Sequence, residues 1–313
     1  MKILIFGGAG FIGTNLCELL LANPENKIHV FDNLSMGNML AKASLSGVNL
    51  IQGDMTDYLA VKKVILEVQP ERIFHLAANS DIAASATNNQ VDLDNTLQTT
   101  VVLTAALRGS SVKDLVFASS SAVYGEVAGE ITESTRKSPA SPYGWMKLAS
   151  ENVLAHFARE NPHLRYLCVR FPNVTGRWQT HGVVHDLVNK LKSNSSALQV
   201  LGDGTQTKPY TLASELCEAI LEAIDSPWQG CMDLNISPNS RSSVKYIAET
   251  IVQVSGLSPV LTYGKNRSGW LGDVPEYRYD TTKFETLTAC KLRSSDQAIL
   301  ESAKWQWAFI SGS

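Results

Sequence analysis

An α/β fold built on a doubly wound parallel sheet is predicted by two features of the first half of the chain. Short apolar runs alternate with segments of helical periodicity, which favours parallel strands covered by helices on both faces. The polar motifs of this half follow the predicted strands, at the edge of a parallel sheet where ligands bind. After Pro172 the pattern loosens. We therefore expect a Rossmann-type sheet with a smaller C-terminal lobe.

The individual elements follow from periodicity and from helix-breaking residues. The apolar run at 3–6 is typical of a buried first strand, and the helix expected at 58–68 ends before Pro70. Ser141 and Pro142 signal the start of another helix. The other expected strands are 27–31, 49–52, 72–76, 113–118, 165–170 and 198–201. The other expected helices are 11–21, 88–107, 142–159, 181–192, 213–224 and 244–254.

A glycine-rich turn connects the first strand to the first helix. Gly7 permits a sharp turn, Gly10 lets the backbone approach a pyrophosphate, and Gly13 lets the helix pack closely on the strand. The amide groups and the macrodipole at the helix start attract phosphate. Asp32 ends the second strand, where an acid accepts the ribose hydroxyls of NAD and repels the 2′-phosphate of NADP. These residues predict a dinucleotide site that prefers NAD, and an ordinary strand–turn–helix corner is the alternative.

Composition and charge exclude several classes of protein. The net charge of −3 gives no basic surface for nucleic acid, and no apolar run is long enough to span a bilayer. The first apolar segment is too short for a signal peptide. The five cysteines form no C-x-x-C pair, and no group of histidines and cysteines has metal-ligand spacing. We expect a cytoplasmic protein with reduced thiols, no metal, no nucleic-acid partner and no membrane partner.

A tyrosine and a lysine at helical spacing are the candidates for chemistry. Tyr143 and Lys147 share a face of their predicted helix, so the ammonium group can lie near the phenol. A positive charge there lowers the pKa of the tyrosine and favours the phenolate, which acts as a base. Ser121, in the serine run after the fifth strand, supplies a hydroxyl for the substrate oxygen. The three side chains suit hydride transfer at a carbinol carbon, and a surface pair beside a polar turn is the alternative.

The order of motifs resembles the NAD-dependent nucleotide-sugar epimerase/dehydratase family of extended short-chain dehydrogenases/reductases, in particular its UDP-glucose 4-epimerase-like members. The likeness covers nearly all of the chain. The motifs that carry it are Gly7-Gly-Ala-Gly-Phe-Ile-Gly13, Asp32-Asn-Leu34, Gly53-Asp54, His75-Leu-Ala-Ala78, Tyr143-Gly-Trp-Met-Lys147 and the segments 119–125, 170–176 and 201–206. The resemblance implies that a sugar hydroxyl gives its proton to Tyr143 and its carbon gives hydride to tightly bound NAD. The ketose then turns over and takes hydride back on its other face.

Further cofactor contacts are expected around this turn and the strand ends. Asp54 faces the adenine amine, or alternatively caps the next helix. Asn95 tethers the loop after the fourth strand, or alternatively is an ordinary helix asparagine. The full set of expected cofactor-binding residues is Gly7, Gly10, Phe11, Ile12, Gly13, Asp32, Asn33, Asp54, Met55, Leu76, Ala77, Ala78, Asn95, Ser119, Tyr143, Lys147 and Phe171.

The expected substrate site departs from the family pattern in two places. Lys208 and Pro209 replace the usual Arg-Asp, and lysine keeps the charge for a diphosphate but loses the bidentate fork. Trp270 stands where the family has an arginine, for which Arg267 is the expected substitute. The full set of expected substrate-binding residues is Asn79, Asp81, Ser121, Tyr143, Asn173, Lys208, Tyr210, Arg267 and Asp273.

One position favours a particular reaction of the family. Its dehydratases and decarboxylases usually carry an acid just before Val-Tyr-Gly, and Ala122 supplies none. We therefore expect an isomerase, an NAD-dependent epimerase acting at C4 of a nucleotide-diphosphate hexose. A dehydratase or reductase of the same family and a non-catalytic NAD-binding regulatory protein are the alternatives.

The resemblance also implies an organisation for the whole chain. Residues 1–172 form the NAD-binding Rossmann domain, and residues 173–313 form mainly the substrate-binding lobe, with a crossover of the chain back to the first domain. The long helices at 88–107 and 142–159 pair with those of a second copy in a homodimer.

Overall fold

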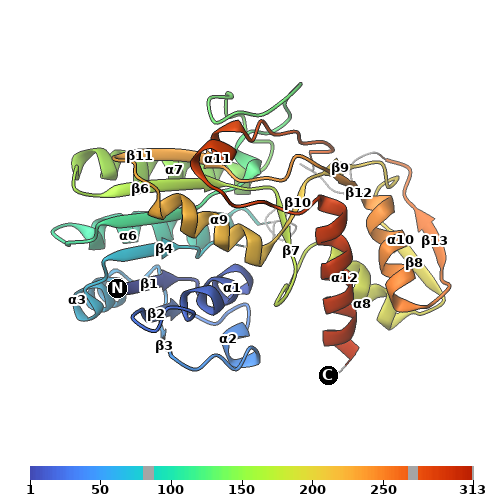
Figure 1. Cartoon of the computed structure of the whole chain (residues 1–313), viewed down its shortest axis with the longest axis horizontal. Helices are drawn as coiled ribbons and strands as arrows, with labels where there is room; N and C mark the ends of the chain where they lie inside the picture. Colours follow the sequence, from blue (N-terminus) through green and yellow to red (C-terminus); the bar gives the residue numbers. More distant parts are fainter. Residues whose placement is uncertain (80–87, 267–273, 312–313) are drawn as a thin grey trace.

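The structure is a computed structural model, and it describes residues 1–79, 88–266 and 274–311 (Figure 1). Three of the expected substrate residues, Asp81, Arg267 and Asp273, lie outside the described residues. A seven-stranded sheet in the order β11-β6-β5-β4-β1-β2-β3 forms its centre, and every neighbouring pair in it is parallel. Its strands are β1 (Lys2–Phe6), β2 (Lys27–Asp32), β3 (Val48–Gln52), β4 (Arg72–His75), β5 (Asp114–Ala118), β6 (Arg165–Arg170) and β11 (Cys231–Asn235).

Helices cover both faces of this sheet because successive side chains of each strand point to opposite faces. In β1, Ile3 and Ile5 belong to the core on one face, while Leu4 and Phe6 belong to the core on the other. The helices of the first face are α1 (Phe11–Leu20) and α9 (Ala213–Asp225), and those of the second are α3 (Tyr58–Val68), α6 (Thr99–Leu107) and α7 (Pro142–Glu160). The expected Rossmann-type doubly wound fold is confirmed.

The strand order places a ligand crevice at one point of the sheet. From β1 the chain builds β2 and β3 on one side, and it then returns to build β4, β5 and β6 on the other side. The connections diverge at the carboxyl ends of β1 and β4, which leaves an opening there. The glycine-rich turn, the loop after β4 and the serine run after β5 all lie at this edge.

The later part of the chain builds a second core beside the sheet (Figure 1). Its helices are α8 (Val183–Ser193), α10 (Val244–Ser255) and α12 (Ser295–Ser311), which pack with the parallel pair β8 (Ala197–Val200) and β13 (Val260–Tyr263). Two short strand pairs connect the two cores, namely β7 (Asn173–Thr175) with β10 (Tyr210–Leu212), and β9 (Thr207–Lys208) with β12 (Ser242–Ser243). Because α9 and β11 pack on the large sheet, the chain crosses back to it after β10.

Short elements complete the description. They are α2 (Met39–Lys42), α5 (Gln90–Asp92), the 3-10 helix η2 (Ser121–Val123) and α11 (Thr282–Leu287). Among the helices of the described residues, none combines the length and the apolar character that crossing a membrane requires.

The helix expected over 88–107 is not a uniform α-helix. It runs as α5, a π-helix η1 (Leu93–Gln98) and then α6. The carbonyl oxygen of Thr96 accepts hydrogen bonds from the hydroxyls of Thr99 at 2.9 Å and Thr100 at 3.2 Å, and from Ser150 of α7 at 3.3 Å. These side-chain donors compete with the helix amides for the carbonyl, which disturbs regular α-helical bonding. Sequence periodicity alone gives no sign of this competition.

Candidate active site

The glycine-rich turn has one glycine that the fold does not need. A Cβ on Gly7, whose φ is +76°, would lie 2.6 Å from the Ala77 nitrogen, and a Cβ on Gly13 would lie 2.4 Å from the Gly8 Cα. Both positions therefore require glycine. A Cβ on Gly10 would meet nothing closer than the Gly7 oxygen at 3.6 Å. The protein thus leaves open the space that the sequence assigns to a pyrophosphate.

Helix α1 begins in the same opening. Gly10 is its N-cap, and no side chain caps the first turn, so these amides remain suited to a bound anion. Phe11 is buried beside Trp178, and Ile12 is half-buried against the same cluster. The side chains of Phe11 and Ile12 therefore pack inward. Any contact that these two residues make with a cofactor would come from their backbone atoms.

Asp32 is aimed at this turn. Its Oδ2 accepts a hydrogen bond from the Ala9 amide at 2.9 Å, and its Oδ1 accepts one from the Leu34 amide at 2.8 Å. Burial raises the pKa of Asp32, and the two backbone hydrogen bonds oppose that rise. Each carboxylate oxygen retains capacity for another donor, as contact with two ribose hydroxyls requires. Asn33 lies exposed beside it.

Asp54 does not cap the following helix, so that alternative is wrong. Its Oδ1 accepts hydrogen bonds from the amide and the hydroxyl of Thr56, both at 2.8 Å. Asp57 caps α3 instead, through the amides of Leu59 and Ala60. Asp54 is exposed near the end of β3, while Met55 is buried in the core under α3. The carboxylate of Asp54 is therefore accessible to a ligand.

The loop after β4 closes the crevice on its other side. The amides of Leu76 and Ala77 both donate to the Phe6 oxygen, at 2.9 and 3.0 Å, which holds the loop against the end of β1. Leu76, Ala77 and Ala78 are half-buried. These small residues border the glycine turn, as the sequence predicts.

Within the described part of the loop, the residue that holds it is Thr96, the neighbour of the expected Asn95. Asn95 is exposed, whereas its neighbour Thr96 is buried and accepts a hydrogen bond from the Asn79 amide at 3.1 Å. Asn79 itself is 8% exposed, and its Nδ2 donates to Asp92 Oδ1 at 2.7 Å. Asn79 therefore directs at least one donor into the protein, toward a buried carboxylate. Nothing in the residue pattern distinguishes Thr96 from Asn95 without the helix geometry.

Tyr143 and Lys147 lie on one face of α7, as their spacing predicts. Ser141 caps the helix, with its oxygen accepting from the Gly144 amide at 3.2 Å, and Pro142 begins it. Tyr143 is half-buried, and the Lys147 Nζ lies 5.9 Å from the centroid of its ring. The Lys147 Nζ also donates to the Ala118 carbonyl at 2.6 Å. The lysine thereby fixes α7 to the end of β5.

The electrostatics of this pair differ from the expectation. Burial raises the pKa of Tyr143 to about 12, hydrogen bonding from Ser120 opposes the rise, and the charge of Asp92 adds to it. Burial also lowers the pKa of Lys147 to about 8, against the charges of Cys168, Glu151 and Asp92. In the chain without its cofactor, desolvation is therefore the largest influence on the pKa of Tyr143, and it favours the protonated phenol.

The serine that faces Tyr143 is Ser120 rather than Ser121. Ser120 has extended backbone angles and caps η2 through the Ala122 amide at 3.2 Å, and it is the serine whose side chain opposes the rise in the pKa of the Tyr143 phenol. Ser121 instead lies near Tyr279, where it opposes the rise in the pKa of that phenol. The chain turns from strand to 3-10 helix between the two serines, and this turn decides which hydroxyl faces α7. Three consecutive serines give no signal for it.

Ser119 and Phe171 also contact the protein itself. The Ser119 hydroxyl is 1% exposed and donates to Glu151 Oε1 at 2.5 Å, so its side chain is directed away from a cofactor. Phe171 is half-buried against the sheet core, and its carbonyl accepts from the Ser121 amide at 3.0 Å. Both residues therefore support the serine turn through contacts within the protein.

His75 is a neutral neighbour of Lys147. It ends β4 fully buried, and burial lowers its pKa to about 3, with the charge of Lys147 contributing. One ring nitrogen hydrogen-bonds the Thr100 hydroxyl at 2.9 Å. It therefore adds no positive charge to the site at neutral pH.

Two of the expected substrate residues are brought together by strand pairing. Asn173 of β7 lies opposite Tyr210 of β10 in a parallel register. Asn173 is exposed, and Tyr210 is buried with its amide donating to the Ser295 hydroxyl at 3.0 Å. Lys208 is half-buried on β9, opposite Ser242.

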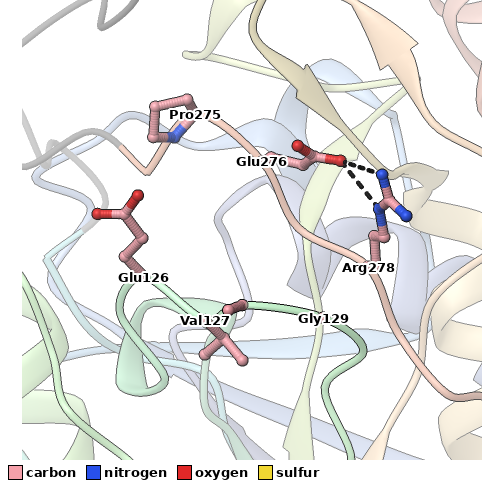
Figure 2. A pocket seen from close by; sticks show the side chains of 7 residues that line it. Glu126, Val127, Gly129, Pro275, Glu276 and Arg278 are labelled. Carbon is pink, nitrogen blue, oxygen red and sulfur yellow. Dashed lines mark hydrogen bonds and ion pairs between the residues drawn. The ribbon is translucent and has the colours of Figure 1, made fainter.

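A separate hollow of about 330 Å³ lies beyond the serine turn (Figure 2). The loop 126–129 forms one wall, and Pro275, Glu276 and Arg278 form the other. Figure 2 shows the Glu126 carboxylate near Pro275, and Glu276 paired with Arg278, with a hydrogen bond of 2.9 Å from Arg278 Nε. None of the expected site residues that the structure describes lines this hollow. Among the residues described, no group of three or more His, Cys, Asp or Glu side chains is arranged to hold a metal.

Comparison with known proteins decides the family. The family model described as the NAD dependent epimerase/dehydratase family matches residues 3–236. The chain belongs to that family. NAD is therefore its cofactor, as the glycine turn and Asp32 indicate, and the family resemblance seen in the motifs is confirmed.

Similar proteins align with this chain over most of its length and of their own. A Bacillus subtilis protein named as an uncharacterized UDP-glucose epimerase is 30% identical over 86% of this chain and 87% of its own. A UDP-galactose 4-epimerase structure is 30% identical with a TM-score of 0.88, covering 99% of this chain and 100% of its own. The Thermus thermophilus UDP-glucose 4-epimerase in complex with NAD is 25% identical with a TM-score of 0.87, covering 98% and 99%.

Proposed function

We propose that the protein is an NAD-dependent epimerase that inverts C4 of a UDP-hexose. The observation that carries the proposal is the grouping of Ser120, Tyr143 and Lys147 at the carboxyl end of β5, at the same sheet edge as the glycine turn. The similar proteins named above act on UDP-sugars, which supports uridine over other bases. A family member with these three side chains is an enzyme, so the non-catalytic alternative is disfavoured.

The residues divide the work of the reaction. Tyr143 takes the proton of the C4 hydroxyl, and Ser120 holds the same oxygen by a hydrogen bond, in the role expected of Ser121. Lys147, fixed to the Ala118 carbonyl, supplies positive charge beside the phenol. When bound, NAD supplies the hydride acceptor. The open face at Gly10 and the carboxylate of Asp32 would hold its pyrophosphate and ribose.

The second half of the chain supplies the sugar-nucleotide contacts in this proposal. Asn173 binds the sugar diphosphate, and Lys208 approaches it as a point charge. Asp81 contacts sugar hydroxyls, and Arg267 with Asp273 binds the nucleotide, as proposed from the sequence. On this division residues 1–172 form the NAD-binding domain and residues 173–313 form mainly the substrate lobe.

The test is product analysis with the wild type and the Tyr143→Phe variant. Wild-type protein incubated with UDP-glucose or UDP-galactose should yield a diastereomer of equal mass, since Ala122 supplies no acid for loss of water. The variant should retain bound NAD and lose at least about 1,000-fold in kcat, because no other described side chain at this position can take the proton. Activity of the variant equal to the wild type would refute the role of Tyr143, and a product lighter by one water would identify a dehydratase instead.

Assembly and compartment complete the proposal. We infer a homodimer through α6 and α7, which present Val101 and Trp145 to the surface at 42% and 54% exposure. We also infer a cytoplasmic location, because all five cysteines are free and three of them, Cys17, Cys168 and Cys217, are buried as thiols.

A further inference from the structure

Behind the serine turn, a carboxylate and a guanidinium are buried together. Glu151 of α7 is 5% exposed, and Arg170 at the end of β6 is 1% exposed. Arg170 Nε donates to Glu151 Oε1 at 2.8 Å, and its Nη2 donates to Oε2 at 2.9 Å. A buried ion pair seldom stabilises a fold more than well-packed apolar side chains would. Its position beside the candidate active site therefore calls for another explanation.

The remaining contact of Glu151 provides that explanation. Its Oε1 also accepts the hydroxyl of Ser119 at 2.5 Å. On the same helix face, one turn earlier, Lys147 donates to the carbonyl of Ala118 at 2.6 Å. Two side chains of α7 thus hold two consecutive residues at the start of the serine turn. These two bonds therefore hold α7, the helix that carries Tyr143, in a fixed position relative to the serine turn.

Arg170 holds the same turn from the opposite side. Its Nη1 donates to the hydroxyl of Tyr124 at 3.1 Å, and Tyr124 donates in turn to Asn235 Oδ1 of β11 at 2.7 Å. Its Nη2 also pairs with Asp233 of β11. The serine turn therefore lies between α7 and β11, and directional, charge-assisted bonds hold it at both ends.

We propose that Glu151 and Arg170 are positioning residues, which hold the Ser120 hydroxyl against the Tyr143 phenol. The proposal rests on the epimerase function proposed above. Apolar packing is non-directional, whereas charge-assisted hydrogen bonds fix a neighbouring hydroxyl in one orientation. A misplacement of about 1 Å at the reacting groups costs on the order of 100-fold in rate.

The Glu151→Gln variant tests this role, with NAD bound and the enzyme in excess over UDP-sugar for the single-turnover measurement. Glutamine keeps the shape of the side chain, but it loses the charge and turns an amide donor toward Arg170 or Ser119. We expect hydride transfer in a single turnover to slow at least about tenfold, with bound NAD and the KM for the sugar within about threefold of the wild type. An unchanged single-turnover rate would overturn the proposal, and so would loss of substrate affinity in place of rate.

A matched control separates positioning from stability. Asp114 at the start of β5 is equally buried and accepts from Arg72 at 2.8 Å and from Arg165 at 2.8 Å, at the opposite edge of the sheet. Asp114→Asn should lower Tm about as much as Glu151→Gln and leave the single-turnover rate of the folded protein unchanged. An equal loss of rate in both variants would overturn the proposal, because it would trace the loss to stability.

A milder variant covers the case in which Glu151→Gln fails to fold. Ser119→Ala keeps the ion pair and removes only its bond to the turn, so we expect at least about a threefold loss of the single-turnover rate. A wild-type rate would overturn the proposal.

The two proposals can fail independently. If the wild type transfers no hydride from any UDP-sugar, the proposed function fails. In that case the positioning role is tested by comparing crystal structures of the wild type and the Ser119→Ala variant. The separation of Ser120 Oγ from Tyr143 Oη should increase in the variant, and an unchanged separation would overturn the proposal.

Discussion

At the scale of single residues, Tyr143 lies in surroundings that oppose the chemistry proposed for it. Burial stabilises the neutral phenol and holds its pKa near 12, while the same burial brings the pKa of Lys147 down to about 8. Nearby Asp92 is buried with one oxygen, Oδ2, that has no hydrogen-bond partner. The protein alone therefore favours the protonated phenol, and in the proposed mechanism the positively charged nicotinamide shifts it toward the phenolate.

This arrangement predicts a cofactor-dependent titration. In cofactor-free protein, the phenol of Tyr143 should keep its proton until the pH approaches 12, because burial disfavours the charged form. Addition of NAD should move the titration at least one pH unit lower, since the positively charged nicotinamide favours the phenolate. The measurement is the phenolate absorbance of the wild type minus that of Tyr143→Phe, with and without NAD. A difference spectrum that NAD does not move would contradict this account of activation.

At the scale of elements, the β1–α1 corner separates glycines needed for folding from one left for a ligand. Gly13 packs on the backbone of Gly8, and a methyl group there has no space to move into. Gly10 has ordinary backbone angles, with φ at −81°, and faces open space. The two positions look alike in the sequence, and their surroundings differ.

The two glycines therefore respond differently to the same change. Gly13→Ala should lower the free energy of unfolding by at least about 2 kcal/mol, because the added Cβ meets backbone that cannot yield. Gly10→Ala should cost about 1 kcal/mol or less, because Gly10 is an N-cap and its added Cβ meets no clash, yet it should weaken NAD binding at least tenfold. Urea unfolding without NAD and a binding titration measure the two effects. Normal NAD affinity in a folded Gly10→Ala protein would contradict the assignment of the pyrophosphate to this position.

At the scale of the whole molecule, the exposed apolar side chains of α6 and α7 define the proposed dimer face. The two helices lie side by side on one face of the sheet, and their buried residues belong to the same core against that face. Such paired helices can form a four-helix contact with a second copy. The exposed residues of α3 provide a comparison, since Leu59 is 74% exposed on the same face of the sheet.

The dimer face can be tested by charge. The double substitution Val101→Glu and Trp145→Glu should convert the protein to a monomer, because four carboxylates would be buried in the contact. Leu59→Glu should leave the assembly unchanged. Light scattering on the purified proteins measures the mass. A monomeric wild type, or a double variant that keeps its dimer mass, would contradict the proposed face.

Patterns of neighbouring residues in the sequence were enough to predict much of the fold and part of the candidate site. Short apolar runs predicted the strands of the sheet, the helical spacing put Tyr143 and Lys147 on one face, and glycine after the first strand predicted the turn. Asp32 could be assigned because a strand end fixes where a side chain points. These features depend on neighbours within a few residues along the chain, and the sequence displays those directly.

Only the tertiary structure decided which groups meet and what their surroundings do to them. The turn into η2 places Ser120, and not Ser121, beside Tyr143, and Thr96 on η1 accepts the hydrogen bond from the Asn79 amide. Glu151 and Arg170 meet across elements, and burial raises the pKa of Tyr143, an effect that depends on every atom packed around the phenol. The reason is physical: spacing along a chain fixes direction over a few residues, whereas burial and pairing arise from segments that only folding brings together.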